Sequence, residues 1–167
     1  MDKKTIYIIV AILAVVIVAV AAVALLMNNE TETTPAPEPQ TIADGDSLQF
    51  KVADSTTGLD YYCAINDFNG EADIVRVDMV MDDACYSYIL NLEDSTSYAS
   101  KDFGETWTKS KFADDELYLE MAYCFATELK DKWDGLSATY SYTADDISYT
   151  ISDIKVNDLD DSLFATS

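Results

Sequence analysis

The sequence contains no histidine, and this absence excludes many familiar catalytic sites. Histidine is the commonest metal ligand and the side chain that most readily changes charge near neutral pH. Without it, Ser-His-Asp and Cys-His catalysis and the usual zinc sites are excluded. Paired carboxylates remain available for glycoside hydrolysis, but the acids are so numerous that spacing selects no pair. We therefore expect that the protein is not an enzyme and holds no cofactor.

Basic residues are scarce as well. The chain has 10 Lys and Arg residues against 31 Asp and Glu residues, and from Thr41 onward the net charge is −19. Such a surface repels nucleic acid and anionic lipid, and it attracts cationic partners or divalent metals. We expect no nucleic-acid partner.

Only three cysteines are present, Cys63, Cys85 and Cys124, and none forms a CxxC motif. An odd number does not make a complete disulfide framework. The expected strand pairing also separates Cys63 from Cys85 by more than the roughly 7 Å that a disulfide spans. We expect free thiols, with Cys63 on the sheet face opposite the helix and Cys124 on the polar flank of the helix.

One stretch, Thr5–Met27, has no charge, no proline and no glycine. As a helix it reaches about 34 Å, which is enough to cross a bilayer core of roughly 30 Å. Lys3 and Lys4 precede it and acidic residues follow, so the positive-inside bias places residues 1–4 in the cytoplasm. We expect residues 5–27 to be a single transmembrane helix that anchors the protein in the cell membrane. A cleaved signal peptide, with its cleavage site near Val20–Ala24, is the alternative.

Residues 28–43 contain all three prolines and read as a disordered Thr/Pro/Glu linker. Residues 44–167 then form one extracytoplasmic, β-rich domain. Alternating apolar residues and turn signals predict strands over most of it. The expected strands are Ser47–Asp54, Leu59–Asn66, Glu71–Met81, Ala84–Leu92, two short strands within Thr96–Lys111, Ser137–Thr143 and Ile147–Val156.

Two turns predict the pairing of the central strands. A two-residue turn at Asn69-Gly70 would place Tyr62 opposite Val77 and Ala64 opposite Val75. A second turn, at Asp82-Asp83, would place Met79 opposite Tyr86, Val77 opposite Tyr88 and Val75 opposite Leu90. In the last strand, a change of apolar phase predicts a β-bulge near Ser152-Asp153.

The domain has one convincing helix, Asp114–Trp133, with an acidic start, a basic end and Gly135 just beyond it. Its apolar face comprises Tyr118, Met121, Ala122, Phe125, Leu129 and Trp133. The fold class is therefore α+β: an N-terminal transmembrane helix, then a curved antiparallel sheet, a meander or half-barrel, packed against one amphipathic helix.

A family resemblance rests on the order of these parts. V-R-V-D-M (Val75–Met79) and Y-x-Y-I-L (Tyr86–Leu90) lie in the meander, Y-x-x-x-D-F-G-E-T-W-T-K (Tyr98–Lys109) follows, and V-N-D-L-D-D-S-L-F (Val156–Phe164) closes the region. This order resembles the LolA/LppX-like, lipoprotein-localisation-factor-type domains. The resemblance implies an open half-barrel over a hydrophobic cavity that holds acyl chains or lipoproteins. Unlike that family, the chain has no helix between linker and first strand, and its anchor is a transmembrane helix.

These observations favour a single-pass cell-surface protein whose acidic domain binds an apolar ligand, such as lipid, or a surface protein. The alternative is a structural or adhesive module without a small-molecule ligand. The candidate ligand-binding residues face one another between sheet and helix: Val77, Met79, Tyr86, Tyr88, Leu90, Met121, Phe125 and Leu129. The carboxylate clusters, and the fragment Asp67–Gly70 of a calcium-loop pattern, are interpreted as solvated turns and caps, so no metal site is expected.

Overall fold

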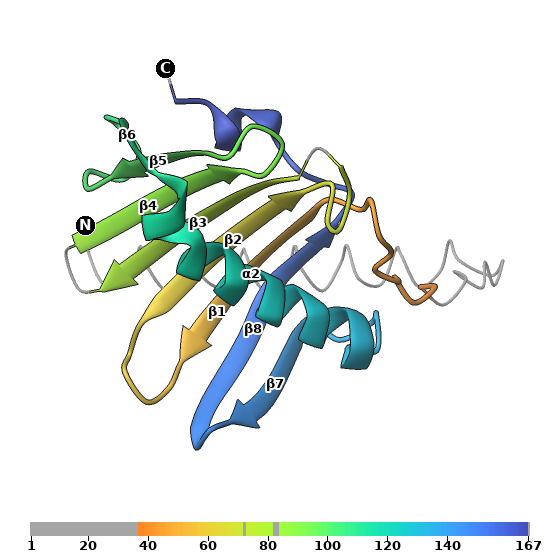
Figure 1. The fold of residues 1–167 in the computed structure, drawn as a ribbon. Helices are drawn as coiled ribbons and strands as arrows, with labels where there is room; N and C mark the ends of the chain where they lie inside the picture. The colour runs from red at the N-terminus through yellow and green to blue at the C-terminus, as the bar shows by residue number, and fades with distance from the viewer. Residues whose placement is uncertain (1–36, 72, 82–83, 167) are drawn as a thin grey trace, which may run out of the picture. The chain divides into compact units, whose positions relative to one another are not determined.

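The computed structural model describes residues 37–71, 73–81 and 84–166 (Figure 1). The predicted membrane span at residues 5–27 and the linker as far as residue 36 lie outside this part of the chain. Among the helices of the described residues, none combines the length and apolar character that crossing a membrane requires.

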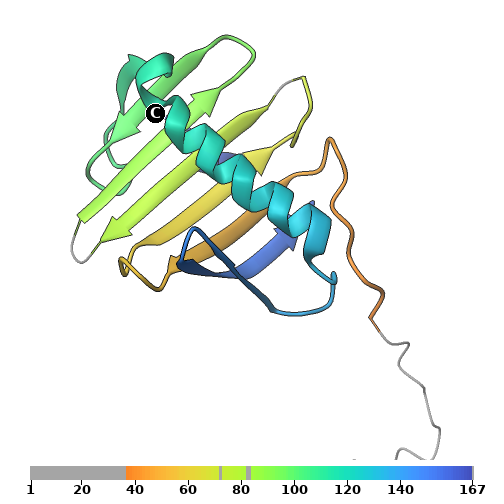
Figure 2. The ribbon, with the colours of Figure 1, turned by 60° about the horizontal axis from the view of Figure 1, so that its bottom comes forward.

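The described residues form one antiparallel sheet of eight strands, crossed by one long helix. The elements are β1 (Leu48–Asp54), β2 (Asp60–Asn66), β3 (Ile74–Met81), β4 (Ala84–Asn91), β5 (Thr96–Ser100), β6 (Thr108–Lys111), α2 (Phe112–Lys132), β7 (Thr139–Ala144), β8 (Ile147–Val156) and the 3₁₀ helix η1 (Asp161–Phe164). The strand order is β6-β5-β4-β3-β2-β1-β8-β7, so the sheet is not closed. It is curved, and α2 lies diagonally across one face (Figure 2). The expected α+β class, with a curved antiparallel sheet and one helix, is confirmed for this region.

The helix forms where the sequence predicts it and buries the predicted face. Asp114 and Asp115 lie in its first turn and Lys130 and Lys132 in its last, which suits the helix dipole. The buried side chains lie on one face of the helix, against the sheet: Asp115, Ala122, Phe125, Ala126 and Leu129. Cys124 is exposed, as predicted.

Gly135, just after α2, allows the chain to approach the main chain of Gln40 closely. Its φ of +71° is a conformation that side chains rarely adopt. A Cβ there would also come within 2.1 Å of the Gln40 carbonyl oxygen. Because glycine allows this approach, the Gln40 N–H donates to the Gly135 carbonyl at 3.0 Å. The segment before β1 is thereby bound to the segment after α2.

The predicted register between β3 and β4 is confirmed. Met79 pairs with Tyr86, Val77 with Tyr88 and Val75 with Leu90. Alternate residues of a strand point to the same face, so all these side chains lie on the α2 side of the sheet.

The predicted register between β2 and β3 is wrong by one residue. Tyr62 pairs with Asp78, and Val77 pairs with Cys63. The two strands are joined by residues 67–73 rather than by a two-residue turn. A shift of one residue reverses the faces of a strand. Cys63 is therefore buried on the α2 side, where Tyr62 was expected, and Tyr62 and Ala64 lie on the outer face.

The longer connection exists because Phe68 turns inward. Its side chain is 0% exposed, and its ring lies 5.4 Å from that of Tyr123 on α2. Its main chain is paired on both sides: the Gly45 N–H donates to the Phe68 carbonyl, and the Phe68 N–H donates to the Asp46 carbonyl. The Asn69-Gly70 signal thus belongs to a loop that carries a core residue.

The predicted bulge in β8 is confirmed. Against β1, Lys155 pairs with Gln49 and Ser152 pairs with Lys51, so two residues of β8 oppose one of β1. Asp153, at the bulge, has a φ of +53°. The extra residue lets both Ile151 and Val156 lie on the α2 side of the sheet, opposite Val52 and Leu48.

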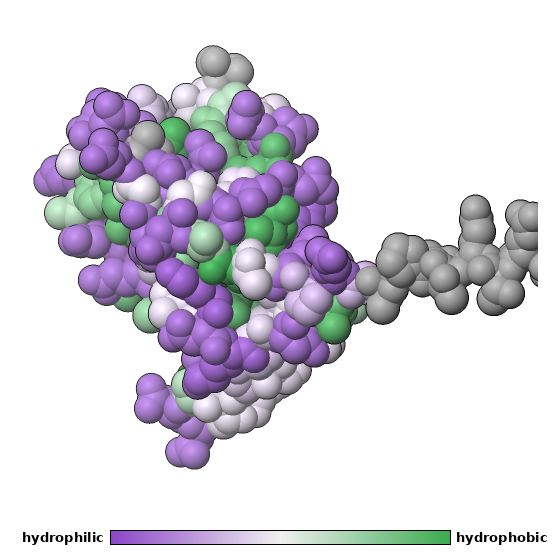
Figure 3. Space-filling model, turned by 90° about the vertical axis from the view of Figure 1, so that its right-hand side faces the viewer, coloured by the Kyte–Doolittle hydropathy of each residue, from purple (hydrophilic) through white to green (hydrophobic). Residues whose placement is uncertain are grey.

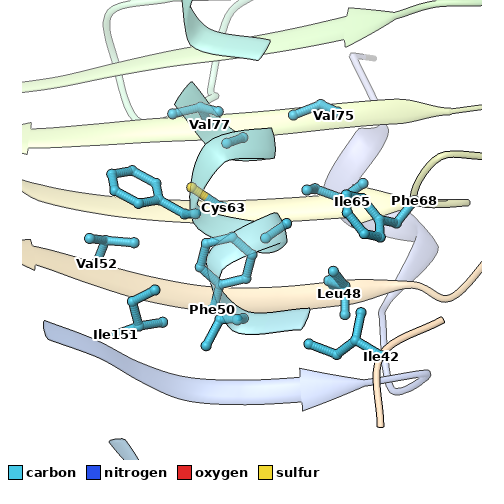
Figure 4. Close-up of a cluster of buried hydrophobic side chains, with 14 residues drawn as sticks. Ile42, Leu48, Phe50, Val52, Cys63, Ile65, Phe68, Val75, Val77 and Ile151 are labelled. Atoms are coloured by element: carbon cyan, nitrogen blue, oxygen red, sulfur yellow. The ribbon is translucent and has the colours of Figure 1, made fainter. Parts of the chain in front are cut away.

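The core lies between the sheet and α2 (Figure 4). Its fully buried members come from the strands, from α2 and from the inward-turned loop: Leu48, Phe50, Val52, Cys63, Ile65, Phe68, Val75, Val77, Leu129 and Ile151. The outer face of the sheet is partly covered by the chain's end, because Arg76 donates to the Leu163 carbonyl at 2.7 Å.

Substitution of Phe68 by alanine tests the inward loop. Loss of a fully buried phenylalanine leaves a cavity, and we expect the free energy of unfolding to fall by roughly 3–5 kcal/mol. The matched control is Phe103→Ala, since Phe103 is 61% exposed and should cost less than about 0.5 kcal/mol. Denaturant unfolding of the two variants measures the difference. Equal losses would contradict the burial of Phe68.

Candidate functional site

The eight candidate ligand-binding residues separate into two groups. The first group is buried in the packed interior between the sheet and α2. It comprises Val77 and Leu90 from the strands and Phe125 and Leu129 from the helix. Met79, Tyr88 and Met121 are half-buried, and Tyr86 is 37% exposed. Only the second group can meet a ligand without displacing the core.

A continuous row of exposed and half-buried side chains lies beside α2. Met79 pairs with Tyr61 on one side and with Tyr86 on the other, so these three residues cross β2, β3 and β4 on the α2 face. Tyr88 lies on the same face, two residues further along β4. We call Tyr61, Met79, Tyr86 and Tyr88 the tyrosine–methionine strip. Figure 1 shows that the strand ends on this side extend beyond the helix.

Aromatic contacts connect the strip to the helix and to the far end of the sheet. Tyr88 stacks on Tyr118 of α2, with ring centroids 3.8 Å apart. The Tyr61 ring lies 6.0 Å from Phe125, which lies 5.3 Å from Tyr149 of β8. These contacts hold the rings of Tyr61 and Tyr88 in place.

The strip is uncharged although the domain is strongly acidic. Burial raises the pKa of Tyr61, and it raises the pKa of Tyr88 further with help from the neighbouring Tyr118. The pKa of Tyr149 is raised in the same way. These hydroxyls stay protonated at neutral pH. The face seen in Figure 3 is by contrast largely hydrophilic, with apolar side chains in small patches.

Two surface pockets lie away from the eight candidates. One, of about 510 Å³, is formed at the β5–β6 hairpin and is lined by Ala99, Ser100, Lys101, Asp102, Thr106, Thr108 and Ser110. The other, of about 260 Å³, lies at the end of α2 and includes Trp133, Leu136 and Ile154. Neither is lined by a residue of the strip.

Polar side chains anchor the start of the helix. The buried carboxylate of Asp115 accepts hydrogen bonds from the hydroxyls of Ser97 and Ser110, which belong to β5 and β6. The sequence shows Asp115 only as one of three acids at a helix start. Its burial depends on the two serines that the sheet brings to it. Asp115 therefore has hydrogen-bond partners for its buried charge, and its role is to fix the start of the helix on the sheet.

The cysteines provide no reactive thiolate in the core. Cys63 and Cys85 are buried, and all three thiols are free. Burial raises the pKa of Cys63 well above its usual range, so its thiol stays protonated. Within the described ranges, no three acidic or cysteine side chains come together closely enough to hold a metal ion.

Sequence analysis missed one unusual group, the carboxylate of Asp73. Asp73 is 0% exposed, and no side chain of the described residues donates a hydrogen bond to its carboxylate. Burial is the main cause that raises its pKa to about 7; a hydrogen bond from the Asn69 main-chain N–H opposes the rise, and the negative charge of Asp67 adds to it. The sequence places Asp73 within the expected strand Glu71–Met81 and gives it no role, whereas β3 begins only at Ile74.

No protein-family model matches this chain, and no curated protein is similar to it.

The pH dependence of stability tests the environment of Asp73. Its folded-state pKa lies above the ordinary value of 3.8, so the folded protein retains a proton that the unfolded chain releases. In a metal-free buffer, stability should therefore be highest below about pH 4 and fall as pH rises to about 7, by up to about 4 kcal/mol from this group. Asp73→Asn should lose this part of the pH dependence.

A second carboxylate, that of Asp102, titrates in a different pH range. Hydrogen bonds from Ser100 and Thr106 lower the pKa of Asp102 to about 2, so its stabilising contribution is lost only in stronger acid. Urea unfolding at several pH values separates the two effects. Identical pH profiles for the wild type and Asp73→Asn would contradict the raised pKa.

Proposed function

We propose that the protein is a single-pass, membrane-anchored surface protein whose acidic domain binds an apolar ligand on the tyrosine–methionine strip. The observation that carries this proposal is an uncharged, aromatic surface on a domain of net charge −19. Aromatic rings and methionine offer large apolar contact areas, and methionine packs adaptably. The ligand class is a lipid acyl chain or a similarly apolar segment.

The fold adds support. The resemblance to LolA/LppX-like domains implies a curved, open sheet with helical cover, and the described sheet is curved, open and crossed by α2. In this proposal, residues 5–27 span the membrane, residues 28–43 act as a spacer, and the domain lies outside the cell. The strip replaces the enclosed cavity of that family as the ligand-binding surface.

One observation favours the alternative, a structural or adhesive module without a small-molecule ligand. The four candidate residues between the sheet and α2 are packed rather than open: Val77, Leu90 and Leu129 are fully buried, and Phe125 is nearly so. An apolar ligand then has only the surface beside the helix. Binding measurements decide between the two.

The binding test uses two exposed tyrosines on opposite faces of the sheet. Tyr86 belongs to the strip, and Tyr62, 43% exposed, lies on the outer face. Parinaric acid, a fluorescent long-chain fatty acid, should bind saturably to the domain from residue 37 onward. Tyr86→Ser should weaken this binding by about two- to tenfold, since an aromatic contact is worth roughly 0.5–1.5 kcal/mol. Tyr62→Ser should leave it unchanged.

The outcomes are distinct. Binding that both variants weaken equally would place the ligand elsewhere. A wild-type domain that binds no parinaric acid, while circular dichroism shows it folded, would favour the structural module.

Topology is tested separately from binding. Protease added to intact cells should remove the domain and leave a short membrane-bound fragment, because Lys3 and Lys4 favour a cytoplasmic N-terminus. An immunoblot for an N-terminal tag detects this fragment. A domain that is degraded only after the cells are lysed would contradict the proposed orientation.

A further inference from the structure

The strand β7 forms one edge of the described sheet and pairs there with β8 (Figure 1). The turn that joins the two strands, Asp145-Asp146, has φ of +51° and +65°, which is the geometry of a type I′ hairpin. Such a turn is closed by a hydrogen-bonded pair, here Ala144 with Ile147, and the hydrogen-bonded pairs then recur at every second residue. The main-chain groups of the residues between them point away from β8: Thr139, Ser141 and Thr143.

This outward row of main-chain groups is unpaired in the part of the chain that the structure describes. Outside the pairing of strands, no main-chain hydrogen bond from the described residues reaches Thr139, Ser141 or Thr143. The side chains of all three are exposed as well. A row of free N–H and C=O groups at the edge of a sheet can pair with a further strand.

The composition of β7 favours such pairing. Edge strands are commonly protected by charged side chains, especially lysine, or by proline. The opposite edge strand, β6, carries Lys109 and Lys111 within four residues. In contrast, Ser137–Ala144 has no charge, no proline and no glycine, although 25% of the chain is charged. Its tyrosines and threonines are residues that favour strands.

We propose that β7 is a dimerisation edge, on which two copies of this chain pair β7 with β7 in antiparallel about a two-fold axis at Ser141. Outward main-chain groups of one strand must meet outward groups of the other. Centred on Ser141, this register pairs Thr139 with Thr143 of the second copy. It joins the two sheets into one and uses the same surface on both copies, as a two-fold interface does.

The side chains of this register complement one another on both faces. On the α2 face, Tyr140 would lie opposite Tyr142 of the second copy, and each pair would extend the stack in which these two rings already lie 5.9 Å apart. On the other face, the hydroxyls of serine and threonine would meet. Aromatic pairs and hydroxyl pairs across strands both stabilise antiparallel sheets.

The register also keeps the acids of the two copies apart. This matters because two domains of net charge −19 repel each other. The first acid after β7, Asp145, would fall opposite Ser137 of the second copy, so no acid faces an acid along the paired strands. On the helix side, Glu128 accepts from the Tyr140 hydroxyl at 2.8 Å and pairs with Lys132 at 3.0 Å, which offsets its charge.

This edge is separate from the tyrosine–methionine strip. The strip crosses β2, β3 and β4, and both β1 and β8 lie between it and β7. Dimerisation therefore does not depend on the proposed apolar ligand, and either can fail without the other.

The test measures the mass of the full-length protein in neutral detergent by light scattering, with the contribution of the detergent subtracted. As the concentration rises, the wild type should approach twice the chain mass of 18.5 kDa. Ser141→Glu should abolish the dimer, because two carboxylates would face each other at the axis. The matched control, Thr108→Glu, adds the same charge to the exposed start of β6 and should leave the dimer intact.

Cysteine cross-linking locates the axis without the glutamate variant. Cys124→Ser first removes the one exposed thiol. In this background, Ser141→Cys should form a disulfide-linked dimer on mild oxidation, since Cα atoms of a hydrogen-bonded pair lie about 5.5 Å apart. Thr108→Cys should stay monomeric. A wild type that is monomeric at every concentration, a dimer that survives Ser141→Glu, or equal cross-linking at positions 108 and 141 would overturn the proposal.

Discussion

Burial of one face of α2 against the sheet is the interaction on which the described domain depends. All three cysteines are free, so no disulfide shares this task. Ala122 and Ala126 let the helix approach closely, and Phe125 and Leu129 fill the space toward the strands. Each of the two larger side chains contributes about 1.5–3 kcal/mol through burial. The helix is also held at its two ends: Asp115 accepts hydrogen bonds from β5 and β6, and Lys130 pairs with Asp44.

The fixed position of the helix determines which part of the sheet remains open. Beneath α2 the side chains are close-packed, as protein interiors are. Beyond it, no helix of the described residues covers the tyrosine–methionine strip, in which Tyr88 contacts Tyr118 and Tyr61 contacts Phe125. The same packing therefore makes the core inaccessible and the strip available. The ring contacts of Tyr61 and Tyr88 would reduce the conformational freedom that the protein loses when a ligand binds there.

Sequence alone predicted the elements well because their periodicities are strong. The register of β3 and β4 followed from a two-residue connection, which leaves one possible pairing once the strands are recognised. The register of β2 and β3 did not follow, because Asn69-Gly70 is a strong local turn signal and the burial of Phe68 is a tertiary effect. That single error placed Cys63 and Tyr62 on the wrong faces.

The candidate site was predicted only in part, because it spans both the correctly predicted β3–β4 pairing and the wrongly predicted β2–β3 pairing. The sequence placed Met79, Tyr86 and Tyr88 on the helix face correctly, since they belong to the well-predicted strand pair. It could not separate them from Val77 and Leu90, because periodicity identifies a face and not the extent of its cover. Tyr61 was missed through the register error, and Asp73 because burial of a loop acid has no signal in composition.

The pairing of β1 with β8 has a consequence for the way the domain folds. The Ser47 N–H donates to the side chain of Asn157, a residue 110 positions later in the chain, and Asn157 donates back to the Ser47 carbonyl. The second edge of β1 is therefore paired only once β8 has formed. Loops of this length close slowly, and sheets rich in such distant contacts fold on the slower end of the range for small domains. During synthesis, β1 to β6 and α2 can associate first, whereas β1 keeps an open edge until β8 has left the ribosome.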